Sequence, residues 1–131
     1  MHRIAKLIVA LSVLGGSAAL SAPAENLGVL SGLRSGKWIV TPRDGGPPRA
    51  LCLGDPAQLA QLRHGGRICN RYVVESGADR TTIQYTCRGA GFGRTSIRRE
   101  TRELVQIDSQ GALAGRPFQF TAEARRVGPC R

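Results

Sequence analysis

The sequence predicts a mainly β (α+β) domain, in which five to seven short antiparallel strands form a curved sheet or partial barrel with one short helix. Two observations support this fold class. Apolar and polar residues alternate with period two over most of the second half of the chain, which is typical of strands with one buried and one solvated face. Turns rich in glycine or proline separate these segments, and one segment, about 56–64, carries the start and stop signals of a helix.

Residues 1–24 have the features of a secretory signal peptide. A basic start precedes an apolar stretch, and Ala22-Pro23-Ala24 supplies the small residues of a cleavage site. We expect cleavage after Ala24, because proline directly after the cut is poorly accepted. An N-terminal anchor helix is the less favoured alternative, since a membrane span needs about 20 apolar residues. The sequence therefore predicts a periplasmic or secreted protein with no membrane span after cleavage.

Residues 25–35 are expected to form a lead-in segment, and residues 36–131 a single domain. The first strand is expected over 36–41, and Pro42 ends it. The following Arg-Asp-Gly-Gly-Pro-Pro segment predicts a turn, and a short second strand is expected over 49–53.

The helix is expected over about 56–64. Asp55 is a candidate N-cap, and Pro56 occupies the first helical position. Leu59 and Leu62 are three residues apart on one face, and a Gly-Gly pair follows His64. These signals place the helix between the second strand and the alternating segments.

The segments 71–75 and 81–88 alternate with period two and predict the next two strands. The second of them has the clearest pattern, with Thr81, Ile83, Tyr85 and Cys87 on one side. This alternation is expected to bury Cys87 together with Ile83 and Tyr85.

Residues 89–93 are glycine-rich and predict a hairpin turn; they lack the spacing of a phosphate-binding loop. Residues 94–100 and 103–109 are expected to form two strands or one long bent strand. The last strand is expected over 117–127. Its predicted inner face consists of Phe118, Phe120, Ala122 and Ala124.

Four cysteines predict two structural disulfides. An even number of cysteines in an exported chain favours disulfides, and there is no Cys-x-x-Cys pair to suggest a zinc or redox motif. The sequence alone allows three pairings of Cys52, Cys69, Cys87 and Cys130. We prefer Cys52–Cys69, which would close a loop around the helix, and Cys87–Cys130, which would tie a strand end to the C-terminus.

The ordered set of these features resembles a known family. The set consists of a signal peptide, Gly36-x-Trp38 in a first strand, Cys52-Leu53 before an Asp/Pro-started helix, Cys69, Cys87 at a strand end, and Gly128-Pro129-Cys130. It resembles the domain-of-unknown-function 3617 family of small exported bacterial proteins, over about residues 33–130. The resemblance implies a periplasmic or secreted location and a four-cysteine β-rich fold. It implies no established chemistry.

No catalytic set is evident, so the sequence predicts that the protein is not an enzyme and binds no metal or cofactor. His64 is the one histidine beyond the predicted signal peptide, and we expect it to be a surface or cap residue. No Gly-x-Ser-x-Gly elbow is present. The acid pairs Glu100/Glu103 and Asp44/Asp55 are conceivable glycosidase pairs, but no motif selects them, and solvated surface carboxylates are favoured.

The chain is strongly basic, with 19 Lys+Arg, 9 Asp+Glu and a formal net charge of +10. Arg94, Arg98, Arg99 and Arg102 are possible contacts for a polyanion; the alternative is a solvated strand face. We expect no nucleic-acid partner, because the protein is exported and most of its few aromatic residues are needed for the core. The expected partner is an anionic envelope component or another envelope protein.

Three function classes follow from the sequence. The preferred one is a non-catalytic binding or structural module of the cell envelope. The second is a carrier of a small apolar ligand in a partial β-barrel. The third is an enzyme with an unrecognised site.

Overall fold

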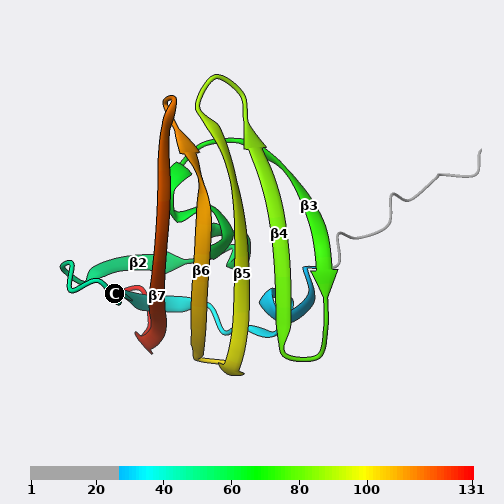
Figure 1. Ribbon diagram of the computed structural model, residues 1–131. Helices are drawn as coiled ribbons and strands as arrows, with labels where there is room; N and C mark the ends of the chain where they lie inside the picture. Colours follow the sequence, from blue (N-terminus) through cyan, green and yellow to red (C-terminus); the bar gives the residue numbers. More distant parts are fainter. Residues whose placement is uncertain (1–26) are drawn as a thin grey trace, which may run out of the picture.

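The computed structural model describes residues 27–131, so the predicted signal peptide lies outside the described residues. Within this range, seven antiparallel strands form one unclosed sheet in the order β2-β1-β7-β6-β5-β4-β3 (Figure 1). The strands are β1 (Gly36–Pro42), β2 (Arg49–Leu53), β3 (Cys69–Ser76), β4 (Arg80–Cys87), β5 (Gly91–Thr101), β6 (Leu104–Leu113) and β7 (Arg116–Gly128). The predicted fold class is confirmed, and the segments 94–100 and 103–109 belong to two separate strands.

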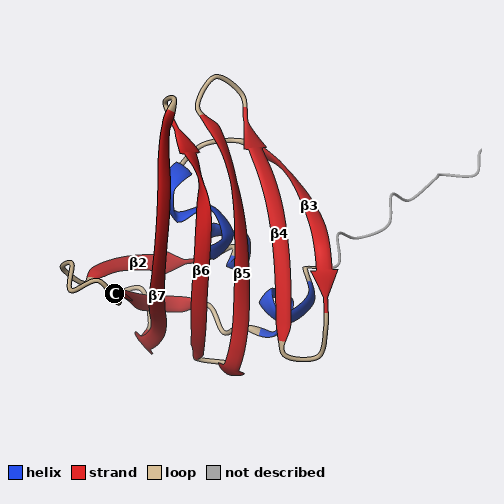
Figure 2. Ribbon diagram, in the orientation of Figure 1, coloured by secondary structure: helices blue, strands red, loops and turns tan. Residues whose placement is uncertain are grey.

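The sheet is strongly twisted, and its first strand is paired with its last. β1 lies between β2 and β7 and pairs antiparallel with both. In Figure 1, β2 runs across the direction of β5 and β6, which shows how far the sheet turns from one end to the other. The curved inner face is covered by two 3-10 helices, η1 (Gly28–Gly32) and η2 (Pro56–His64), coloured blue in Figure 2.

The core lies between the inner face of the sheet and the two helices. The indole of Trp38 is fully buried, and its Nε1 donates a hydrogen bond to the backbone oxygen of Arg34 at 3.0 Å. Val29, Leu30 and Leu33 are buried in the same core cluster. The packed unit therefore begins before residue 36, within the segment that we expected to be a lead-in.

η2 lies where the sequence predicts a helix, but it is a 3-10 helix with a break. Asp55 forms a capping box at the start of η2. Its side chain accepts a hydrogen bond from the backbone N–H of Ala57, and the side-chain oxygen of Gln58 accepts one from the backbone N–H of Asp55. Pro56 occupies the start, as predicted. The helix is interrupted at Gln61, whose φ of −127° and ψ of 42° are not helical.

The predicted disulfide pairing is wrong. The structure pairs Cys52 with Cys130 and Cys69 with Cys87. Cys69 and Cys87 are directly opposite in the β3–β4 ladder, and Cys130 follows β7, two strands from β2. Cys52 and Cys69 cannot meet because β2 and β3 form opposite edges of the sheet. The two disulfides are compatible with an exported protein.

Candidate functional site

His64 is buried, which corrects the expectation of a surface or cap residue. It is 1% exposed, and its ring meets that of Tyr85 edge-on. Its Nε2 lies 3.1 Å from the backbone oxygen of Ala90, and its Nδ1 lies 3.0 Å from the Tyr85 hydroxyl. Because a carbonyl oxygen only accepts, we assign the ring proton to Nε2, and Nδ1 accepts from the tyrosine hydroxyl. His64 therefore joins the end of η2 to the β4–β5 hairpin, and this contact is structural.

Tyr85 can occupy this position because its cross-strand partner, Gly93, has no side chain. Tyr85 pairs with Gly93 in the β4–β5 ladder, and a Cβ at Gly93 would lie 2.4 Å from the tyrosine ring. Burial raises the pKa of Tyr85 to about 12, so its hydroxyl remains a hydrogen-bond donor at neutral pH.

The four arginines of the predicted polyanion contact do not form one surface. Arg94 is exposed on the outer face of β5, and Arg98 pairs with Glu100 at 3.2 Å. Arg99 donates to the backbone oxygen of Ala78 at 3.5 Å. Alternation along β5 places Arg94 and Arg98 on one face and Arg99 on the other.

Arg102 has a structural contact as well. It lies in the turn between β5 and β6, and its Nε donates to the backbone oxygen of Gly32 at 2.9 Å. This hydrogen bond from the Arg102 guanidinium holds the end of η1 against the sheet. Arg94 and Arg98 are thus the two members of the predicted set that the structure leaves on the outer face.

The conceivable acid pairs serve local structure. Glu103 contacts Arg34, and Asp55 caps η2. Asp44 accepts a hydrogen bond from the backbone N–H of Gly46 at 2.9 Å. In residues 27–131, no group of three or more His, Cys, Asp or Glu side chains is placed to hold a metal ion. In the same range, no helix is long and apolar enough to cross a membrane.

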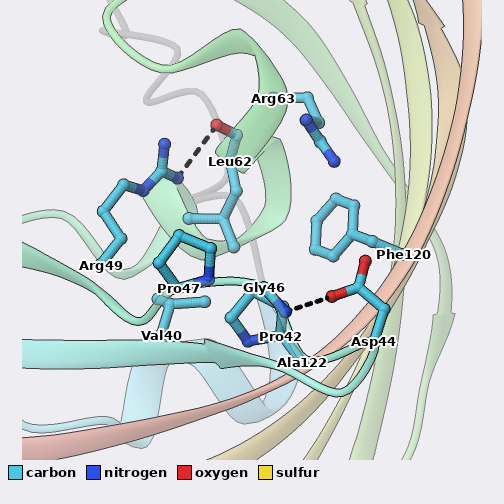
Figure 3. A pocket seen from close by; sticks show the side chains of 10 residues that line it. All are labelled: Val40, Pro42, Asp44, Gly46, Pro47, Arg49, Leu62, Arg63, Phe120 and Ala122. Atoms are coloured by element: carbon cyan, nitrogen blue, oxygen red, sulfur yellow. Dashed lines mark hydrogen bonds between the residues drawn. The ribbon is translucent and has the colours of Figure 1, made fainter.

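A cleft of about 280 Å³ opens between the β1–β2 loop, η2 and the inner face of β7 (Figure 3). Apolar side chains form most of its walls, and two arginines and one aspartate complete its rim. The lining residues are Val40, Pro42, Asp44, Gly46, Pro47, Arg49, Leu62, Arg63, Phe120 and Ala122. Val40 and Ala122 are almost fully buried and form the floor, whereas Leu62 and Phe120 are partly exposed.

The walls of the cleft are locally rigid. The hydrogen bond from Gly46 N–H to Asp44 closes a tight turn, and Pro47 and Pro48 restrict the backbone that follows. On the opposite side, Arg49 donates through Nη2 to the backbone oxygen of Leu62 at 3.4 Å, which links β2 to η2 (Figure 3). The shape of the rim is therefore constrained by contacts within the chain itself.

Arg63 places a positive charge on the aromatic wall of the cleft. Its guanidinium carbon lies 5.2 Å from the centroid of the Phe120 ring and 5.9 Å from that of Phe118. This is cation–π geometry, which holds the side chain against the wall and leaves its charge uncompensated. None of the ion pairs between described residues includes Arg63 or Arg49.

A second, shallower hollow of about 600 Å³ lies on the outer face of the sheet. A row of exposed side chains crosses five neighbouring strands there through direct cross-strand pairs: Tyr72, Gln84, Arg94, Gln110 and Gln119. Phe92 is 53% exposed beside this row. The hollow is more open than the cleft, and its lining combines polar side chains with Phe92, Pro117 and Phe118.

The residues of the cleft carry no local motif that marks them as a site in the sequence. Arg49, Leu62 and Phe120 are far apart in the chain, and they meet because β1 pairs with both β2 and β7. The Asp-Gly-Gly-Pro-Pro segment predicted a turn, and this turn forms one rim of the cleft. No signal in the sequence placed η2 over that turn.

Comparisons with known proteins add no relative: no family model, no curated protein and no solved structure matches the chain. The resemblance to the domain-of-unknown-function 3617 family thus stays a prediction from the ordered motifs.

Proposed function

We propose that the protein is a non-catalytic binding module of the cell envelope, and that it holds a small apolar ligand, or the apolar end of a larger envelope component, in the cleft. The predicted signal peptide and the two disulfides support a site of action outside the cytoplasm. The chemistry of the described residues supports binding, because the acids and the histidine considered above serve local structure.

The cleft is the observation that carries this proposal. Ligand sites are concave, mostly apolar and largely preformed, with a few polar groups that orient the ligand. The cleft has apolar walls, a rim held by prolines and hydrogen bonds, and a volume of about 280 Å³, close to the lower end of the usual range of about 300–1,000 Å³. A preformed site loses little free energy to ordering on binding.

The position of the cleft changes the carrier hypothesis. The space inside the curved sheet is filled by core side chains, Trp38 and Leu30 among them. A ligand would therefore lie at the edge of the inner face, between the β1–β2 loop and η2, rather than in the interior of a barrel.

The proposal is tested with an uncharged probe, 1-octanol, titrated into the oxidised, ¹⁵N-labelled protein. We expect saturable shifts of the backbone resonances of Leu62, Phe120 and their neighbours. Leu62→Trp, which fills the cleft, should abolish them. Gln119→Trp, the same bulk added on the outer face of β7, should leave them unchanged. Absence of saturable shifts, or shifts confined to the outer face, would reject the cleft as the binding site.

The outer face supports a second candidate, the binding of an anionic envelope polymer. The specific observation is the aligned row from Tyr72 to Gln119, with Arg94 at its centre. Arg94→Gln should then weaken binding to lipopolysaccharide at low salt, since exposed charges are screened at higher ionic strength. Unchanged affinity in the folded variant would remove this candidate.

A further inference from the structure

Two positively charged side chains line the cleft, although the binding of an uncharged apolar ligand requires none. These side chains are Arg49 and Arg63. Arg49 is held by the backbone oxygen of Leu62, and Arg63 by the rings of Phe118 and Phe120. Neither contact neutralises a charge, so both guanidinium groups keep free donors for a ligand.

One acidic group shares the rim. Asp44 lies beside Phe120 in Figure 3, and its Oδ1 is engaged by the backbone N–H of Gly46. The residues lining the cleft therefore carry two positive charges and one negative charge, and the whole chain carries +10. This balance favours an anion over a cation or a neutral group at the mouth.

The size of the cleft limits the apolar part of the ligand. Its volume of about 280 Å³ lies just below the usual range of about 300–1,000 Å³ for ligand sites, so a short hydrocarbon chain suits it better than a long-chain lipid. An eight-carbon chain serves as the probe. The guanidinium group offers paired N–H donors that match the two oxygens of a carboxylate.

From these observations, and resting on the proposed function, we propose that the cleft binds a small amphipathic carboxylate with a short hydrocarbon chain. Its hydrocarbon chain lies between Leu62, Phe120 and the floor of Val40. Its carboxylate lies at the mouth and accepts hydrogen bonds from Arg49 and Arg63. The two arginines select the ligand by charge, and the apolar walls supply most of the affinity.

The test compares octanoate with 1-octanol, two ligands of the same chain length that differ in charge. We expect the wild-type protein to bind octanoate roughly three- to ten-fold more tightly, since each exposed ion pair adds only a modest attraction. Arg63→Gln and Arg49→Gln should each reduce this preference. Arg63→Lys should restore part of it, and Arg80→Gln, a neutralised exposed arginine of β4 that does not line the cleft, should leave it unchanged.

The outcomes separate the two proposals. Equal affinity for octanoate and 1-octanol in the wild-type protein, or a preference that survives both glutamine substitutions, would overturn the carboxylate assignment while the cleft still binds apolar chains. If neither ligand binds, the proposed function fails with it. Circular dichroism of each variant verifies that a lost preference is not lost folding.

Discussion

The contact between His64 and Tyr85 predicts a strongly non-additive double-mutant cycle. Tyr85→Phe leaves Nδ1 of the buried histidine without its donor. His64→Leu leaves the Tyr85 hydroxyl without its acceptor, whereas the backbone oxygen of Ala90 keeps the hydrogen bond that it accepts from the backbone N–H of Ala114. In the double variant neither the histidine nor the hydroxyl is present, so this pair leaves no group unpaired.

The magnitudes follow from the number of unpaired buried groups. With about 1.5 kcal/mol for each unpaired group, Tyr85→Phe and His64→Leu should each lower the free energy of unfolding by about 1.5 kcal/mol. The double variant, which leaves no group of this pair unpaired, should lose little. It would thus be more stable than the sum of the single variants by about 3 kcal/mol, at the upper end of the range for residues in contact.

Equilibrium unfolding in guanidinium chloride, with both disulfides intact, measures these differences. The single tryptophan, Trp38, is fully buried, so its fluorescence reports global unfolding. A near-neutral His64→Leu, or single effects that add within about 0.5 kcal/mol, would refute the buried hydrogen-bonded position of His64.

Three further effects are expected. The double variant Cys52→Ser/Cys130→Ser should lower the free energy of unfolding by about 4.5 kcal/mol, because the unfolded chain regains the entropy of a loop with a sequence separation of 78. Peptide mapping of the unmodified protein should recover the Cys52–Cys130 pair. A recovered Cys52–Cys69 peptide would contradict this pairing. Gly91→Ala should destabilise the protein by about 2 kcal/mol or more in the same unfolding assay, because φ at Gly91 is +122° and the added Cβ would lie 2.0 Å from the backbone oxygen of Ala112. Gly54→Ala, whose added Cβ meets no atom within 4 Å, should be nearly neutral. Above pH 10 the unfolded chain loses the Tyr85 proton while the folded protein retains it up to about pH 12, so stability should fall by about 2 kcal/mol across this window, and Tyr85→Phe should flatten the profile.

The sequence predicted the strands and the helix well, because the signals for each of them lie within its own segment of the chain. Alternation of residues 81–88 placed Ile83, Tyr85 and Cys87 on the buried face, and all three are buried in β4. Asp55 and Pro56 located the start of η2. Its 3-10 form was not predicted, because the sequence signals mark where a helix starts and ends and do not distinguish helix types.

The disulfide pairing and the role of His64 depend on strand order, which local patterns do not contain. The preferred pairing assumed that the helix is enclosed by the cysteines on either side of it. Cys52 pairs instead with Cys130 because β1, next to β2, also pairs with the last strand. His64 looked like a cap because glycines follow it, yet η2 packs its last turn against the β4–β5 hairpin.

The cleft was beyond prediction for the same reason. Its aromatic wall, Phe120, was correctly placed on the inner face of the last strand, where it is half-buried. The loop that faces it precedes it by more than seventy residues. Only the pairing of β1 with β7 brings the loop, η2 and Phe120 together.

The most direct test of the account is the location of octanoate in its complex with the oxidised protein, from intermolecular nuclear Overhauser effects. We expect contacts from the methyl end of the chain to the side chains of Leu62, Val40 and Phe120, with the carboxylate end near Arg49 and Arg63. Contacts confined to the outer face around Phe92, or a reversed orientation with the carboxylate at the apolar floor, would contradict it.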